Sequence, residues 1–189
     1  MSSALADKWT ILDRFIQLWR YRKVVGSIPL NCVLADLGCG RGDFLRHVQS
    51  RIATGYGIDT AIAHTDVGGN LHFKEANLNN AIPLNDEIID VVISLAVIEH
   101  LHAPAVFVKE IFRILKPDGM CILTTPSPLS KPLLEFLAYR LKIISARDIK
   151  DHKRYFCRED LRELFSDFGT LQISSFQGGL NMLVVAKKR

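Results

Sequence analysis

The chain has 189 residues, the length of about one ordinary domain. Its content of 48% hydrophobic and 23% charged residues is typical of a soluble globular protein with a buried core. A formal net charge of +4 is too small to predict a nucleic-acid partner. No stretch approaches the ~20 apolar residues of a membrane span.

The cysteines predict a reducing compartment. None of the four forms a CxxC pair, and no His/Cys cluster has zinc spacing. The N-terminus also lacks the basic-then-apolar pattern of a secretory signal. We therefore expect free thiols, no metal site and a cytoplasmic protein. The four residues are Cys32, Cys39, Cys121 and Cys157.

The first predicted element is a helix over residues 5–23, within an N-terminal helical extension over 1–29. Apolar residues recur there at steps of four and three, so they line one helix face. They are Leu5, Trp9, Leu12, Ile16 and Trp19.

After residue 30, short β-rich runs alternate with amphipathic helical segments. The run 90–96 is almost continuously apolar, which is typical of a strand buried on both faces. The predicted strands are 32–38, 55–59, 71–77, 90–96, 120–126, 171–176 and 180–187. The predicted helices between them are 42–52, 60–66, 104–115 and 158–168. The sequence Lys-Pro-Asp-Gly at Lys116–Gly119 predicts a turn directly after helix 104–115.

This alternation predicts a single α/β domain in which helices cover both faces of a seven-stranded, mostly parallel sheet. The last two strands are separated only by Gln177, Gly178 and Gly179. Such a short glycine-rich link suits a hairpin, so one strand should run antiparallel to the others.

The strongest chemical signal is VLADLGCGRGDFL over residues 33–45, where a buried strand meets Gly38, Gly40 and Gly42 before a helix. Glycines there let a ligand lie against bare main chain, and the helix N-terminus offers unpaired N–H groups. The spacing is GxGxG, not the GxGxxG of dinucleotide enzymes, and Asp36 adds a carboxylate at the strand end. A carboxylate suits a cationic ligand such as S-adenosylmethionine, which carries a sulfonium and an ammonium but no phosphate.

Asp59 ends the predicted strand GYGID and lies 21 residues after Gly38. That spacing is close to the ~20-residue offset of the acidic residue that binds ribose hydroxyls. Alone, such a residue is equally well explained as a solvated turn aspartate. Together with the glycine loop, Asp59 predicts a nucleoside site.

Over residues 30–187 the chain resembles the class I S-adenosylmethionine-dependent methyltransferases, in the small-molecule and lipid branch similar to ubiquinone-pathway enzymes. Six motifs occur in the family's order. Besides the glycine loop and GYGID they are EANLNNAIPL, IIDVVISLAVIEHL, VKEIFRILKPDGMCILTTP and HKRYFCREDLRELFSDFG. The resemblance implies a Rossmann-like, doubly wound sheet, with S-adenosyl-L-methionine as cofactor and S-adenosyl-L-homocysteine as product.

The resemblance also implies contacts with each part of the cofactor. The methionine portion would lie against the glycine loop and the ribose against Asp59. Asn77, where relatives often have Asp, would flank the adenine with Leu78. The reacting methyl would face the end of strand 90–96. The complete implied set is Asp36, Gly38, Gly40, Gly42, Asp59, Asn77, Leu78, Leu95 and Ala96.

Methyl transfer from a sulfonium is an in-line displacement, so the protein mainly supplies proximity and alignment. A general base is needed only when the acceptor must lose a proton. The candidates are His100, after strand 90–96, and His152, in the family's HxRxF block. For each histidine the alternative role is a hydrogen bond that orients a loop.

Residues 127–151 form an insert between strand 120–126 and the HKRYF block, with an apolar helix candidate and nearby positive charge. Two interpretations stay open. One is a lid over an apolar or anionic acceptor, with peripheral membrane contact. The other is a helix packed on the domain or against a second copy.

The predicted function is methyl transfer from S-adenosylmethionine to a small-molecule or lipid-like acceptor. The alternatives are a catalytically silent cofactor-binding protein of the same fold and an NAD-dependent oxidoreductase. The first would break the glycine loop or lose Asp59, and the second would need GxGxxG and a second domain. Amino-methylating nucleic-acid enzymes have an Asn/Asp-Pro-Pro-aromatic tetrapeptide where this chain reads LAVIEH. The acceptor and the oligomeric state stay open.

Overall fold

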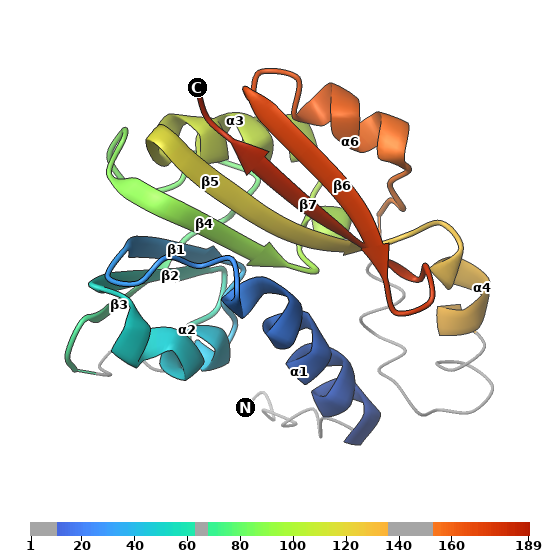
Figure 1. Ribbon diagram of the computed structural model, residues 1–189, viewed down its shortest axis with the longest axis horizontal. Coiled ribbons are helices and arrows are strands. Elements are labelled where there is room, and N and C mark those ends of the chain that lie inside the picture. The colour runs from blue at the N-terminus through green and yellow to red at the C-terminus, as the bar shows by residue number, and fades with distance from the viewer. Residues whose placement is uncertain (1–10, 63–67, 136–152) are drawn as a thin grey trace, which may run out of the picture.

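The computed structural model describes residues 11–62, 68–135 and 153–189. Within these ranges seven strands form one sheet in the order β3–β2–β1–β4–β5–β7–β6 (Figure 1). Among them only β7 runs antiparallel to its neighbours, as predicted. The strands are β1 (Val33–Leu37), β2 (Thr54–Asp59), β3 (Leu71–Glu75), β4 (Ile89–Leu95), β5 (Leu115–Pro126), β6 (Thr170–Phe176) and β7 (Asn181–Lys187).

Helices cover both faces of the sheet, which confirms the predicted layers (Figure 1). α1 and α2 pack on one face through Tyr21, Val24 and Phe44. α3 and α6 pack on the other through Phe107 and Leu161. The described helices are α1 (Ile11–Val25), α2 (Asp43–Val48), η1 (Gln49–Arg51), η2 (Ile98–His100), α3 (Pro104–Ile114), α4 (Ser130–Glu135) and α6 (Arg158–Leu164).

β5 begins earlier than predicted, and the expected turn at Lys116–Gly119 lies inside the strand. Leu115 already pairs with Ile89 of β4, and the register shifts before Val91 pairs with Met120. Asp118 lies within this irregularity with a φ of 63°. The sequence signal for a turn therefore marks a bulge, because the end of α3 feeds directly into the sheet.

Two predicted helices have different limits in the structure. α6 ends at Leu164 and not at 168. Its predicted last residues lead into the sheet, since Gly169 N donates to Lys187 O of β7 at 2.9 Å. The predicted helix 60–66 shows no helical turn over 60–62, and its remainder lies outside the described residues, as do residues 1–10 of the chain.

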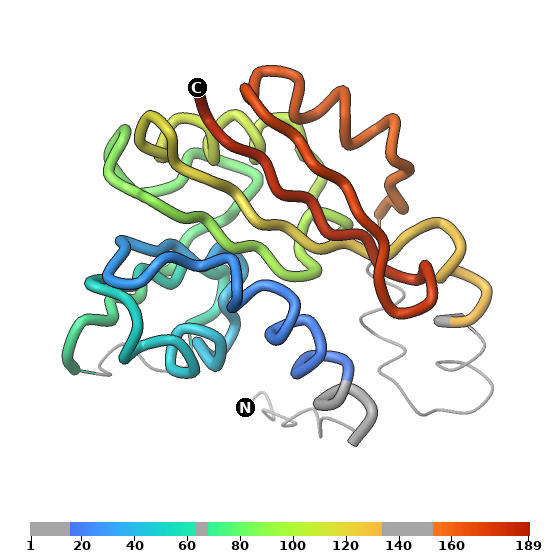
Figure 2. The backbone as a smooth tube through the Cα atoms, viewed as in Figure 1, coloured from blue at the N-terminus to red at the C-terminus, as the bar shows by residue number. Residues whose placement is uncertain are grey.

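The β6–β7 hairpin forms where the sequence predicts it (Figure 2). Gln177, Gly178 and Gly179 all have positive φ, at 53°, 66° and 88°. α4 lies beside this hairpin in Figures 1 and 2, and Ser127 Oγ donates to Gly179 O at 2.7 Å. The first residues of the 127–151 insert are thus tied to the hairpin. Residues 136–151 of that insert lie outside the described residues.

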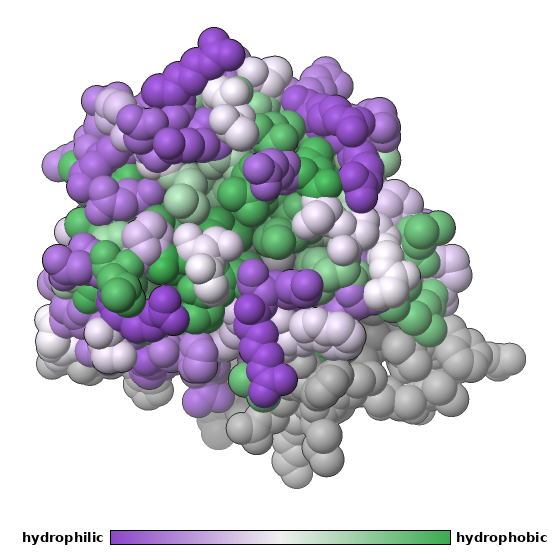
Figure 3. All heavy atoms as spheres, in the orientation of Figure 1, coloured by the Kyte–Doolittle hydropathy of each residue, from purple (hydrophilic) through white to green (hydrophobic). Residues whose placement is uncertain are grey.

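Apolar side chains gather on the face drawn in Figure 3, over the region where β5 and β7 run side by side. Met120 of β5 and Leu183 and Val185 of β7 are partly buried and pack against the core cluster that includes α1. None of the helices within the described ranges is long and apolar enough to cross a membrane.

Candidate active site

The carboxyl ends of the parallel strands bring the predicted site residues to one edge of the sheet. The strand order reverses between β1 and β4, and ligands in open α/β sheets bind at such a switch point. The glycine loop follows β1, and its first residue continues the pairing of β1 with β2, since Gly38 N donates to Ile58 O at 2.7 Å. Gly40 N then donates to Asp59 Oδ2 at 2.8 Å. The glycine loop and the predicted ribose ligand are therefore joined directly.

Glycine occupies the three loop positions for different structural reasons. A Cβ at Gly38 would collide with the side chain of Val97 from the chain after β4, and one at Gly42 would lie 2.5 Å from the Phe73 ring. A Cβ at Gly40, where φ is 51°, meets no heavy atom of the described residues within 4 Å. Gly38 and Gly42 thus permit close packing, while Gly40 borders open space that a ligand can fill.

Asp59 keeps acceptor capacity beyond its bond to the loop. Asp59 Oδ1 accepts weakly from Ala61 N at 3.2 Å and from Thr60 Oγ1 at 3.3 Å. A carboxylate offers about four lone-pair sites, and the Thr60 hydroxyl can rotate away. One site on each oxygen is then available, which fits the two neighbouring hydroxyls of a ribose.

Asp36 is a buried carboxyl, 3% exposed, at the end of β1. Burial raises its pKa to about 7, with a smaller contribution from the negative charge of Asp59. Asp36 and burial also raise the pKa of Tyr21 on α1, burial being the larger cause. A cationic group placed beside Asp36 would stabilise its carboxylate form, so the site fits a ligand with an ammonium or a sulfonium.

The segment after β3 is fixed to α3 by a charged clamp. Glu110 Oε2 accepts from Ile82 N at 2.8 Å and from the Arg113 guanidinium at 2.7 Å. Arg113 also donates to the carbonyl oxygens of Ile82 and Leu84, each at 2.9 Å. This charge-assisted network holds the segment after Asn77, and the pKa of Glu110 is lowered mainly by its hydrogen bond to Arg113.

Asn77 and Leu78 lie in different surroundings. Asn77 is exposed at the sheet edge, just beyond Ala76, whose N donates to Asp59 O at 2.8 Å. Leu78 is 4% exposed and packs in the core with Ile82. The structure therefore brings Asn77 close to Asp59, the predicted ribose ligand, and Leu78 anchors the segment in the core.

The chain turns sharply after β4, at the position predicted to face the reacting methyl. Leu95 is half-buried, and Ala96 adopts a left-handed conformation with φ 58°. Ala96 N donates to Thr124 O at 2.9 Å, which holds the turn against β5. Strained positions of this kind cost about 1–3 kcal/mol and cluster at functional sites.

The histidine candidates are placed unequally. His100 is half-buried at the end of η2, and its backbone N donates to Val97 O at 2.9 Å. His152 lies outside the described residues. The residue after it, Lys153, donates its backbone N to Glu99 O at 2.8 Å. The HKRYF block thus begins its described course beside η2.

Glu99 is a candidate functional residue that the sequence-based prediction missed. Its side chain is 1% exposed, and Oε2 accepts from Thr125 Oγ1 at 3.1 Å. Burial raises its pKa, against the opposing effects of nearby hydrogen bonds and of the basic side chains of His100 and Arg20. The only sequence signal was a carboxylate at the end of a nearly continuous apolar run.

Three buried polar atoms near this end of the sheet have no hydrogen-bond partner within the described part of the chain. They are Glu99 Oε1, Thr124 Oγ1 and Gln177 Nε2. Thr124 and Thr125 are adjacent on β5, and Gln177 Oε1 accepts from Asn181 Nδ2 at 2.5 Å. Buried polar groups in proteins are normally satisfied, so these three atoms have hydrogen-bonding capacity that the described residues do not use.

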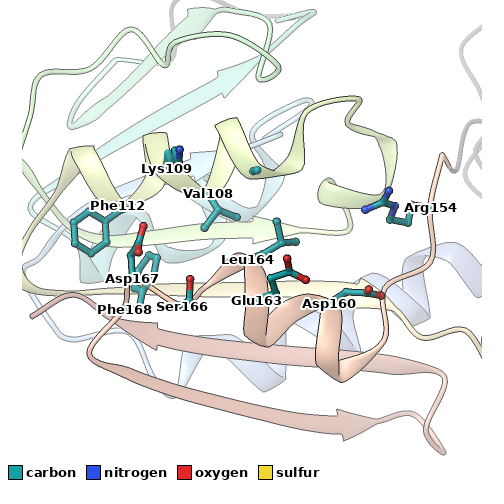
Figure 4. A pocket seen from close by; sticks show the side chains of 11 residues that line it. Val108, Lys109, Phe112, Arg154, Asp160, Glu163, Leu164, Ser166, Asp167 and Phe168 are labelled. Atoms are coloured by element: carbon teal, nitrogen blue, oxygen red, sulfur yellow. The ribbon is translucent and has the colours of Figure 1, made fainter.

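A separate hollow of about 410 Å³ lies between α3 and α6 (Figure 4). Phe112 and Phe168 lie together at one end, and Arg154 lies at the other. Acidic side chains of α6 and the following turn, among them Glu163 and Asp167, line the same hollow. It contains none of the predicted cofactor residues.

The four thiols are free, as predicted. Cys157 acts as the N-cap of α6, since Asp160 N lies 3.5 Å from its sulfur and Cys157 N donates to Asp160 Oδ2 at 2.7 Å. Among the described residues, no three His, Cys, Asp or Glu side chains group in a way that could hold a metal ion.

The fold and the arrangement of the glycine loop define a class, and the chain belongs to it: the methyltransferase domain family, whose profile matches residues 13–171. A methyltransferase structure from Archaeoglobus fulgidus shares the fold, with a TM-score of 0.74 and 17% identity over 93% of this chain and 94% of that one. These findings confirm the predicted fold class and the resemblance. S-adenosylmethionine is the cofactor of this class, and the site residues above fit it.

Two relatives are similar in sequence. A probable S-adenosylmethionine-dependent methyltransferase from Mycolicibacterium smegmatis is 30% identical over 174 residues, covering 85% of this chain and 66% of that protein. A ubiquinone biosynthesis O-methyltransferase from Maricaulis maris is 30% identical over 121 residues, covering 60% of this chain and 45% of that protein. The chain thus spans about half to two thirds of the length of these relatives.

Proposed function

We propose that this chain transfers the methyl group of S-adenosylmethionine to a small-molecule or lipid-like acceptor. The observation that carries the proposal is the hydrogen bond of 2.8 Å between Gly40 N and Asp59 Oδ2, beside the open space at Gly40. It joins the two motifs of the proposed nucleoside site at the ends of β1 and β2, beside the switch point between β1 and β4. The relative named for ubiquinone biosynthesis supports an acceptor of small, lipid-like character.

The cofactor supplies, when bound, an electrophilic methyl on a sulfonium. Asp59 would hold the ribose and Asp36 the cationic methionine end. Leu95 and Ala96 would flank the path between the methyl and the acceptor. The protein then contributes binding and alignment, which are the main requirements of an in-line displacement.

An acceptor hydroxyl would also have to lose a proton. We propose His100 as one candidate base, because it follows β4 at the acceptor side of the site. His152 is retained as the second candidate through its place in the HKRYF block. Glu99 joins them, because its pKa is raised by burial and its Oε1 lacks a partner within the described residues.

The test is to incubate the protein with methyl-labelled S-adenosylmethionine and fractionated cell extract. Labelled small molecules together with S-adenosylhomocysteine are expected from the parent, and much less of both is expected from Asp59→Ala when the cofactor concentration is below its Kd for the variant. Binding of S-adenosylhomocysteine without any labelled product would favour a catalytically silent protein. Binding of NAD in its place would show that the cofactor assignment is wrong.

A further inference from the structure

The Asn79 side chain can face only one way. Asn79 Oδ1 accepts from His102 N at 2.7 Å and from Ala103 N at 3.1 Å. Backbone N–H groups only donate, so the oxygen of this amide must be the atom that faces them. Its nitrogen therefore faces away from these two groups and is available to Asn77.

The orientation of Asn77 follows from that of Asn79. Asn79 N lies 2.9 Å and Asn79 Nδ2 lies 3.0 Å from Asn77 Oδ1. Both groups are donors, so the two lone pairs of the Asn77 oxygen are in use. Asn77 Nδ2 has no acceptor among the residues that the structure describes. The exposed side chain thus offers hydrogen-bond donors to a neighbouring ligand.

Asn77 lies one strand beyond the proposed ribose ligand, on the side away from the methyl. Asp59 of β2 pairs with Glu75 of β3, and Asn77 follows two residues later. At this edge the strands follow one another in the order β4, β1, β2, β3, and the ends of neighbouring strands are about 4.8 Å apart. The base and the 5′ carbon leave a ribose on opposite sides. With the 5′ end toward the glycine loop of β1, the base lies over the end of β3.

We infer that Asn77 binds an unprotonated ring nitrogen of the adenine as a hydrogen-bond donor, and that it does not bind the exocyclic amino group. The inference rests on the proposed function, which supplies the bound nucleoside. The amino group is itself a donor, and the Asn77 oxygen has no lone pair left for it. Asn77 is therefore a specificity-determining residue that reads the ring and not its amino substituent.

The test compares S-adenosylhomocysteine with its 6-desamino analogue, which keeps the ring nitrogens and lacks the amino group. Titration calorimetry gives the Kd of each ligand for the parent and for Asn77→Ala. Loss of one hydrogen bond is expected to weaken both ligands by the same factor, about fivefold. Melting temperatures without ligand check that the variant is folded.

Asn77→Asp provides a second, opposite result. The carboxylate still accepts from both donors of Asn79, but its other oxygen is an acceptor in place of a donor. The ratio of the desamino Kd to the S-adenosylhomocysteine Kd is expected to rise at least about fivefold, the worth of one hydrogen bond. Asn80→Asp is the matched control, because it makes the same charge change at an exposed neighbour. That variant is expected to leave the ratio unchanged.

Three results would overturn the inference while the parent binds both ligands. They are a loss in Asn77→Ala confined to S-adenosylhomocysteine, no loss for either ligand, and an unchanged ratio in Asn77→Asp. A parent that binds neither ligand would overturn the proposed function and this inference with it. The parent measurement therefore separates the two failures.

Discussion

The two halves of the candidate site are built differently. At the ends of β1, β2 and β3 the polar groups bind one another, as Gly40 binds Asp59 and Asn79 binds Asn77. At the ends of β4 and β5, buried polar atoms of Glu99 and Thr124 have no partner within the described residues. The proposed cofactor half is thus preassembled, while the proposed acceptor half contains polar atoms that the described residues leave without hydrogen bonds. A ligand on the first half meets groups that are already positioned, which lowers the ordering cost of binding.

Blocking the open space at Gly40 is expected to have the largest effect. Gly40→Val should weaken S-adenosylhomocysteine binding by more than about 100-fold, or ~2.7 kcal/mol, because the side chain fills the ligand's space. Gly178→Val is the matched control, since Gly178 also has positive φ and no described atom within 4 Å of its Cβ position. Both variants bear a similar backbone strain of about 1–2 kcal/mol. Calorimetry should show lost binding only at Gly40, and retained binding in both would contradict the site.

Removing the carboxylate of Asp59 should have the next largest effect. Hydrogen bonds to a charged group are worth about 1.5–3 kcal/mol each, so Asp59→Ala should weaken S-adenosylhomocysteine binding at least tenfold. The variant also removes the carboxylate oxygen that accepts the hydrogen bond of Gly40 N in the described structure. Asp59→Asn keeps one acceptor oxygen and should fall between the parent and Asp59→Ala. An unchanged Kd in Asp59→Ala would exclude the ribose role.

The pH dependence of binding should report on Asp36. Its folded-state pKa is raised to about 7, so its contribution to stability is full below about pH 4 and is lost as the pH rises through 7. A cationic ligand favours the carboxylate, and binding then releases a proton. The affinity for S-adenosylmethionine should rise about tenfold from pH 6 to pH 8, because the ionised fraction of Asp36 in the free protein rises over this range. In Asp36→Asn this dependence should disappear, and its persistence would assign it to another group.

The smallest effects are expected on the acceptor side, from two adjacent buried threonines. Thr125 Oγ1 bonds to Glu99, so Thr125→Val should lower the free energy of unfolding by about 1 kcal/mol. Thr124 Oγ1 has no partner in the described structure, so Thr124→Val should leave stability unchanged or raise it by up to ~1 kcal/mol. Denaturant unfolding measures both. Equal losses in the two variants would remove the contrast between the halves of the site.

The cofactor half was largely predictable because its determinants are local in sequence. A strand followed by a glycine loop, and a carboxylate ending the next strand, must meet when parallel strands pair side by side. Asp36, Gly40, Asp59 and Asn77 were all predicted, and the structure brings them to one edge. What the sequence did not separate was the role of each glycine. Gly38 faces Val97 and Gly42 faces Phe73, which are distant in the chain.

The sequence by itself determined the class of fold and the cofactor motifs, because periodicity, glycine spacing and strand-end carboxylates act over short stretches of chain. The tertiary structure decided the rest. It placed β7 between β5 and β6, turned the predicted Lys116–Gly119 turn into a bulge, and buried Glu99 against Thr125. It also fixed the amide of Asn77 through backbone groups of residues 102 and 103. Burial and hydrogen-bond direction depend on neighbours from other elements, and only packing determines which neighbours those are.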